Sequence, residues 1–104
     1  MKIKISLHPS TSGFAEDKDD AKTIRATKII PALKKGNSVV LDFSDVTFAT
    51  QSFVHALIGE ALNRFGENTL QLIEFKNCSP QIQGLIGLVV DYSLGGFENE
   101  TTSN

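Results

Sequence analysis

A run of apolar residues without alternation constrains the fold of this chain most strongly. Residues 38–43 read Ser-Val-Val-Leu-Asp-Phe, so that Val39, Val40 and Leu41 follow one another directly. Successive side chains of a strand point to opposite faces, and such a run therefore predicts a short strand that is buried on both faces. The run predicts the central strand of an α/β fold.

The segment after this run carries the clearest helical pattern. Its apolar residues recur at intervals of three and four, which is the spacing of one face of a helix. They are Val54, Leu57, Ile58, Ala61, Leu62 and Phe65. Either Thr50 or Ser52 is expected to cap the start of this helix, and Gly66 its end.

An earlier helix is expected over residues 21–35. The acidic residues that precede it suit a helix start, where the dipole favours negative charge. They are Asp17, Asp19 and Asp20. Pro31 lacks an N–H group and disfavours helical geometry before it, so we expect either a kink there or two shorter helices.

Two further strands and a last helix complete the pattern. Residues 1–7 alternate between apolar and polar, which predicts a half-exposed edge strand, and residues 69–75 predict a third strand. The last helix is expected to begin at Ser79, with proline at its first position. Its Gly84 and Gly87 predict close packing against a neighbouring backbone.

This order of elements predicts the fold class. A βαβαβα order gives a small α/β fold, with a parallel or mixed central sheet of three to four strands and helices packed on it. A chain of 104 residues holds one core. Residues 1–96 are therefore expected to form a single domain, and residues 97–104, poor in apolar side chains, a disordered tail.

Composition excludes several classes of function. The net charge is −2, and clustered basic residues that could bind nucleic acid are missing. No apolar run approaches the roughly 20 residues of a membrane span. A single cysteine, Cys78, rules out an internal disulfide framework and fits a reducing compartment. We expect a cytoplasmic protein that binds neither membrane nor nucleic acid.

The sequence offers little catalytic chemistry. Ser52 and His55 share a helix face, but no third group that could orient the histidine follows from the pattern. Cys78 has no cysteine or histidine at the spacing of a zinc site. The chain is therefore expected not to be an enzyme and to carry no metal or cofactor.

The junction between the central strand and the clearest helix is the predicted working edge. Ligands of open α/β sheets bind beyond the carboxyl ends of the strands, and this junction lies there. The predicted partner-binding residues are Ser44, Asp45, Phe48, Ala49, Thr50, Gln51, Ser52, Phe53 and His55.

This junction resembles the signature of STAS domains, which are the regulatory modules of anti-sigma-factor antagonists and sulfate transporters. Asp42, Phe43, Ser44, Val46 and Phe48 match the first part of that signature, and Ser52 falls on the serine that partner kinases phosphorylate in antagonists. Thr50 and Gln51 stand where antagonists carry Asp and Ser, and Phe53 replaces a glycine. In these positions the chain is more similar to the STAS-like bacterial domains of unknown function.

The resemblance implies a regulatory, protein-binding role. Such domains are often encoded beside histidine-kinase-type ATPases, so the implied partner is such an ATPase or another regulator. Ser52, or Thr50 beside it, is the implied phosphorylation site. The alternative is that Ser52 serves only as the helix cap.

Two other possibilities stay open. The first is a small-ligand sensor that holds a nucleotide or an anion near Ser44, Thr50 and Ser52. The second, compatible with every function above, is a homodimer through an uncovered sheet face or through the edge strand at residues 2–7.

Overall fold

The structure of this protein is a computed structural model that describes residues 1–9 and 13–94. The tail expected at residues 97–104 lies outside the described residues.

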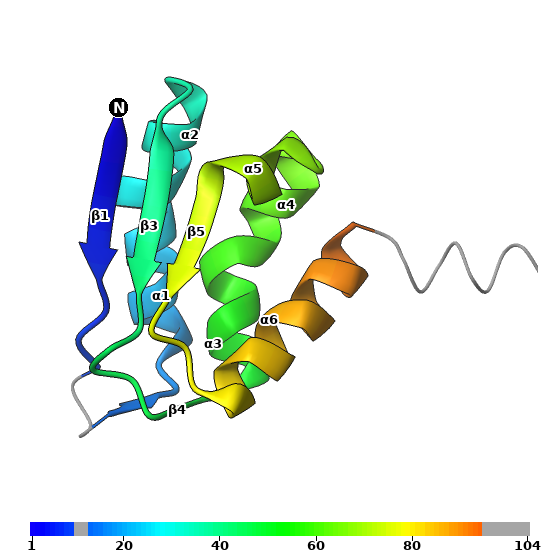
Figure 1. Cartoon of the computed structure of the whole chain (residues 1–104). Helices are drawn as coiled ribbons and strands as arrows, with labels where there is room; N and C mark the ends of the chain where they lie inside the picture. Colours follow the sequence, from blue (N-terminus) through cyan, green and yellow to red (C-terminus); the bar gives the residue numbers. More distant parts are fainter. Residues whose placement is uncertain (10–12, 95–104) are drawn as a thin grey trace, which may run out of the picture.

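The centre of the molecule is a parallel three-stranded sheet (Figure 1). Its strands are β1 (Lys2–Ser6), β3 (Ser38–Asp42) and β5 (Ile73–Lys76), in the spatial order β1-β3-β5. Val39 of β3 lies between Ile3 and Ile73, and all of Val39, Val40 and Leu41 are buried. The predicted α/β fold and the central position of this strand are confirmed.

A continuous helical segment follows the short strand β2 (Phe14–Ala15) and contains one π-helical turn. It comprises α1 (Lys18–Ile24), a π-helical turn η1 (Arg25–Ile29) and α2 (Ile30–Lys34). The N–H of Ile30 donates to the carbonyl of Arg25, five residues back, and Pro31 lies in the first turn of α2. A wider turn before Pro31 relieves the clash of its ring with the preceding carbonyls. The proline is thus accommodated by a π turn between two short α-helices.

The second helical segment contributes many residues to the hydrophobic core. It comprises α3 (Gln51–Val54), a second π turn η2 (His55–Gly59) and α4 (Glu60–Phe65), and it ends at Gly66 with a φ of 65°. The predicted stripe is buried against the sheet, and only Phe65 at its end is partly exposed. The predicted helix and its C-terminal glycine are confirmed.

The predicted third strand is too long at its start. Residues 68–72 form a helical turn, α5 (Asn68–Leu72), and only the last part pairs with β3 as β5. The buried Thr69 donates its hydroxyl to the carbonyl of Ala61, 3.1 Å away, which fixes this turn on α4. The apolar residues of this segment could fill either a helix or a strand, and this tertiary bond decides for the helix.

The last helix, α6 (Pro80–Ser93), begins as predicted at Ser79, whose hydroxyl accepts from the N–H of Ile82. The reason expected for its glycines is wrong. A Cβ atom added to Gly84 or Gly87 would meet no atom within 4 Å, because both lie on the exposed side of the helix.

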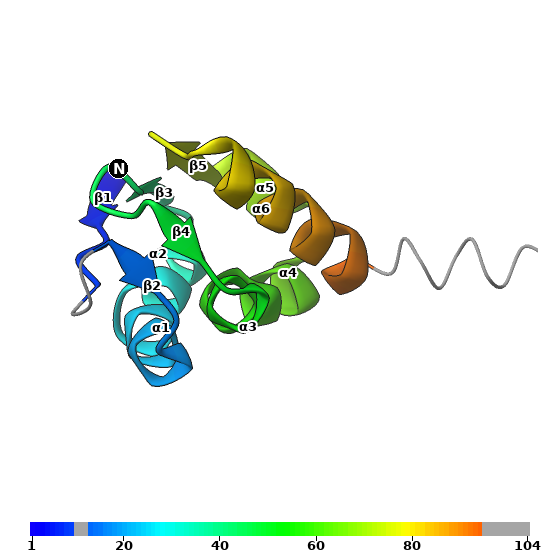
Figure 2. The same ribbon diagram turned by 90° about the horizontal axis from the view of Figure 1, so that it is seen from below.

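A second, two-stranded parallel sheet lies below the first one (Figure 2). It pairs β2 (Phe14–Ala15) with β4 (Phe48–Ala49). Seen from below, the two helical segments lie on one face of the main sheet, and β4 leads directly into α3. Within residues 1–9 and 13–94, no helix is long and apolar enough to cross a membrane.

Candidate functional site

Asp42 organises the carboxyl edge of the main sheet. It is the last residue of β3, and only 8% of its surface is exposed. Its carboxylate accepts hydrogen bonds of 2.9 Å from the N–H of Ser44 and 2.9 Å from the side-chain amide of Asn77. Lys4 lies 3.5 Å from its second oxygen. Asp42 therefore shapes the loop that follows β3.

The environment of Asp42 stabilises its charged form. The amide of Asn77 contributes most and the N–H of Ser44 next, and together with Lys4 they lower the pKa of Asp42 from 3.8 to about 2. Partial burial acts in the opposite direction and is outweighed. Asp42 is thus a carboxylate at all physiological pH values.

The loop after β3 presents two of the predicted partner-binding residues. Ser44 and Asp45 are both exposed. His8, from the loop after β1, lies with its Nδ1 2.7 Å from a carboxylate oxygen of Asp45. The loops that follow two neighbouring strands therefore meet at this edge, as the topology requires for a parallel sheet.

Phe48 is the large apolar residue of this edge. Its ring is 48% exposed, and one side packs on Phe14 with the ring centroids 5.2 Å apart. Phe48 therefore presents a half-exposed aromatic ring beside the polar residues of this edge.

Gln81 fixes β4, and sequence reasoning missed it. Its amide accepts from the N–H of Ala49 at 3.1 Å and donates to the carbonyl of Ala49 at 2.8 Å. The side chain of Gln81 thus supplies the buried Ala49 with the two backbone hydrogen bonds that a neighbouring strand would otherwise make. Nothing in the local pattern pointed to it, because Gln81 lies 32 residues away in the chain.

The start of α3 separates the two hydroxyl-bearing residues by role. Thr50 is the N-cap, and its hydroxyl accepts from the N–H of Phe53 at 3.2 Å. Ser52 is exposed inside the first turn, and its hydroxyl makes no hydrogen bond to any residue the structure describes. The cap is therefore Thr50, and the alternative that Ser52 serves as the cap is wrong.

Two of the predicted partner-binding residues are internal. Ala49 is 1% exposed and Phe53 5%, and both belong to the hydrophobic core. Their side chains position β4 and α3 and offer almost no surface to a partner.

Ser52 and His55 lie on a ridge between two open grooves. The first groove, of about 620 Å³, lies between the second helical segment and the end of α6, where Val89 and Tyr92 line it. The second, of about 450 Å³, faces the first helical segment and is lined by Lys18, Lys22 and Arg25. Ser52, His55 and Asn63 line both grooves.

Gly59 provides room for the ring of His55. A Cβ atom on Gly59 would lie 3.1 Å from the Cδ2 atom of the imidazole, one helical turn earlier. The ring therefore rests on the bare backbone of η2. No hydrogen bond joins it to Ser52 within the described part of the chain.

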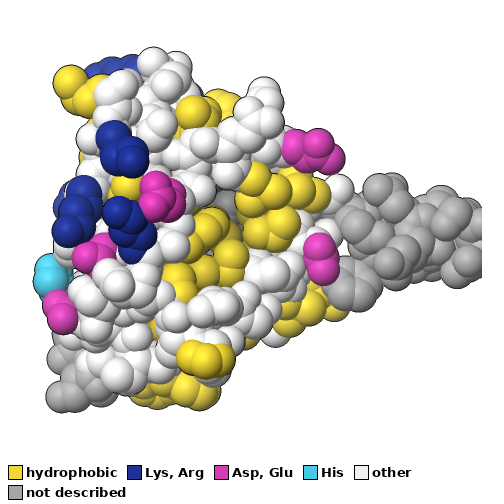
Figure 3. Space-filling model, viewed as in Figure 1, with side chains coloured by type: hydrophobic (Ala, Val, Ile, Leu, Met, Phe, Trp, Pro, Cys, Tyr) yellow, Lys and Arg dark blue, Asp and Glu magenta, His cyan; other side chains and the backbone are white. Residues whose placement is uncertain are grey.

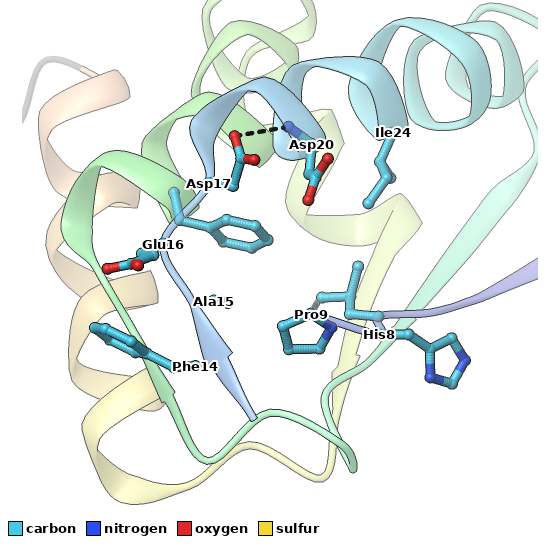
Figure 4. A pocket seen from close by; sticks show the side chains of 10 residues that line it. His8, Pro9, Phe14, Ala15, Glu16, Asp17, Asp20 and Ile24 are labelled. Carbon is cyan, nitrogen blue, oxygen red and sulfur yellow. Dashed lines mark hydrogen bonds between the residues drawn. The ribbon is translucent and has the colours of Figure 1, made fainter. Parts of the chain in front are cut away.

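A small cavity near β2 bears on the ligand hypothesis (Figure 4). Its volume is about 140 Å³, and Glu16, Asp17 and Asp20 are among the residues that line it. Ligand pockets usually enclose about 300–1,000 Å³. The cavity is thus smaller than a usual ligand pocket, and none of Ser44, Thr50 and Ser52 lines it. No group of three or more His, Cys, Asp or Glu residues that could hold a metal ion occurs among residues 1–9 and 13–94.

One comparison with known proteins gave a match. A family model described as a STAS-like domain of unknown function (DUF4325) matches residues 20–83. This range includes every predicted partner-binding residue. Neither the curated proteins nor the solved structures contain a significant match.

Proposed function

Because this chain belongs to the family of STAS-like domains of unknown function, which matches well over half of it, we propose that it is a regulatory module that binds a protein partner. The binding surface consists of the exposed predicted residues and is called the β4–α3 surface below. Its members are Ser44, Asp45, Phe48, Gln51, Ser52 and His55.

The exposed ring of Phe48 is the observation that carries this proposal. Interfaces are enriched in aromatic residues that are surrounded by polar ones. Phe48 has this environment, since Ser44 and Asp45 precede it in an exposed loop and Gln51 follows it. The hydrogen bonds from Gln81 hold the neighbouring Ala49, so the ring is presented by a fixed backbone.

The proposed partner is a histidine-kinase-type ATPase, and the proposed control is phosphorylation of Ser52. The unengaged hydroxyl of Ser52 supports this choice over Thr50, whose oxygen is occupied by the helix cap. A phosphate would add about −1.5 to −2 charges. Lys18 and Lys22 line the same groove as Ser52 and would draw that charge toward α1. The β4–α3 surface would thereby change its charge without a change of fold.

The test of binding uses a histidine-kinase-type ATPase from the same organism as this chain. We expect Phe48→Ala to weaken binding at least tenfold in titration calorimetry, with circular dichroism unchanged. Leu70→Ala is the matched control, because Leu70 is 42% exposed but lies outside the β4–α3 surface. Equal binding by both variants contradicts the proposed surface.

The test of control is phosphorylation by the same ATPase with Mg-ATP, read by mass spectrometry. We expect one phosphate, lost in Ser52→Ala and retained in Ser44→Ala and Thr50→Ala. A phosphate retained in Ser52→Ala, or no phosphate on the wild-type chain, contradicts the proposed phosphorylation. Neither result affects the test of binding.

The small-ligand sensor receives less support. Thr50 uses its hydroxyl for the cap, and Ser44 lies between the carboxylates of Asp42 and Asp45. An anion there would meet negative charge. A rise of the melting temperature with a nucleotide or with inorganic phosphate would favour the sensor instead.

A further inference from the structure

The outer edge of β5 is an open strand edge. The carbonyl of Lys76 accepts from the N–H of Phe43, so Lys76 turns its backbone groups toward β3. Backbone groups alternate along a strand. The N–H and C=O groups of Phe75 therefore face away from β3 and form the open part of this edge. Those of Ile73 face the same way, but its N–H already donates to the carbonyl of Thr69 at the end of α5. Beyond them lies a groove of about 390 Å³ toward the start of α6, lined by Phe75, Cys78 and Ile86 among others.

The charged side chains of this edge are complementary to those of the same edge in a second copy of the chain. Glu74 and Lys76 lie on the exposed face of the sheet, on either side of Phe75. If a second copy pairs antiparallel with Phe75 opposite its own Phe75, each Glu74 faces a Lys76 across the pair. The same alignment lets the two Phe75 residues exchange both backbone hydrogen bonds, since their groups point outward.

The opposite edge of the sheet lacks this property. β1 carries Lys2 and Lys4 on the same exposed face, where they pair with Glu74 and Asp42 of their own chain. Two copies joined antiparallel about Ile3 would place Lys2 opposite Lys4. Like charges directly opposite each other destabilise a strand pair, and lysines on an edge are a common protection against such pairing.

The face of the molecule seen in Figure 3 carries both charged and hydrophobic side chains. The charged side chains of the sheet gather on one side, and hydrophobic side chains lie beside them toward α6. Phe75, Ile86 and Val90 are among the apolar residues that pack on the core and stay partly exposed. A strand added at β5 would cover the groove and pair the open backbone groups.

We infer that two copies of this chain form a dimer by pairing their β5 strands antiparallel around a two-fold axis at Phe75. The dimer joins the two sheets into one of six strands. It uses none of the residues that define the β4–α3 surface and does not depend on the proposed function.

The test is a charge exchange followed by sedimentation equilibrium. Glu74→Lys places two lysine pairs in contact across the axis, and Lys76→Glu two glutamate pairs, so each single variant is expected to weaken association about tenfold or more. The double variant Glu74→Lys with Lys76→Glu restores opposite charges and is expected to restore the dimer. Glu67→Lys and Lys28→Glu make the same charge changes at exposed sites elsewhere and are expected to have no effect.

A cross-link tests the alignment directly. Opposite residues of a hydrogen-bonded antiparallel pair have Cα atoms about 5.5 Å apart, which suits a disulfide. In a Cys78→Ser background, Phe75→Cys is expected to give a covalent dimer on oxidation, and Lys2→Cys none. A monomer at all concentrations, or a double variant that stays as weak as the single ones, overturns the inference. If the charge variants fail to fold, the absence of the Phe75→Cys cross-link overturns it equally.

Discussion

The side-chain amide of Asn77 donates a 2.9 Å hydrogen bond to the carboxylate of Asp42. Asp42 ends β3 and Asn77 directly follows the neighbouring β5, 35 positions away in the chain. Asn77 has a φ of 59°, a left-handed conformation that asparagine tolerates better than most residues. The bond thus joins the end of β3 to the loop after β5, at the edge of the sheet where the β4–α3 surface begins.

The Asn77–Asp42 bond should govern the acid stability of the fold. The pKa of Asp42 is about 2 in the folded chain against an ordinary value of 3.8, so the folded state binds fewer protons between these values. The stability that the carboxylate contributes is therefore present above about pH 4 and lost as the pH falls toward 2. We expect Asn77→Gly, which keeps the left-handed backbone but removes the amide, to raise the pKa of Asp42 toward 3.8.

Carbon-detected NMR titration of Asp42 measures this change directly. Urea unfolding at several pH values gives the stability, and Asp42→Asn should flatten its dependence on pH in the same acid range. An Asp42 that titrates unchanged in Asn77→Gly contradicts the role given to the amide.

The cap of α3 predicts different changes in stability when the hydroxyls of Thr50 and Ser52 are removed. Thr50→Ala removes the acceptor for the N–H of Phe53 and should cost about 0.5–2 kcal/mol in the free energy of unfolding. Ser52→Ala removes an exposed hydroxyl without a partner and should change it by less than about 0.5 kcal/mol. Urea unfolding measures the free energy of unfolding of both variants. A larger loss for Ser52→Ala than for Thr50→Ala would contradict Thr50 as the cap.

Gln81 should matter for stability more than its surface position suggests. Gln81→Ala leaves the N–H and the carbonyl of the buried Ala49 unpaired, which should cost about 1–3 kcal/mol. Gln83→Ala is the matched control on the same helix, because its amide makes one exposed bond to the carbonyl of Cys78. Thermal unfolding should show a clear loss for the first variant and little for the second.

The glycines of α6 offer a route to a more stable chain. Gly84→Ala and Gly87→Ala should each stabilise the protein by about 0.5–1 kcal/mol, because alanine favours the helix and the added methyl group meets open space. Gly66→Ala is the control. It also meets open space, but its φ of 65° disfavours alanine, so a loss of stability is expected there. Destabilisation by the two helix variants would show that the glycines serve a packing role after all.

Secondary structure could be predicted from the sequence wherever the buried residues of an element form a long periodic pattern. The unalternating run at Val39–Leu41 placed the central strand, and the stripe from Val54 to Phe65 placed the core helix, because burial imposes a spacing that is visible in one segment. Short segments carry too little pattern. The sequence predicts a strand over residues 69–75, but its first part belongs to α5, where Thr69 bonds to Ala61.

The position of the junction between β3 and α3 follows from the sequence, but the roles of its residues depend on the tertiary structure. The junction after β3 had to lie at the carboxyl end of the sheet, since parallel strands end at one edge. Which hydroxyl caps α3, that Ala49 and Phe53 face the core, and that Gln81 and Asn77 hold this edge depend on contacts between distant segments. A local pattern contains no information on such contacts, because a hydrogen bond needs a partner that only the folded chain brings within reach.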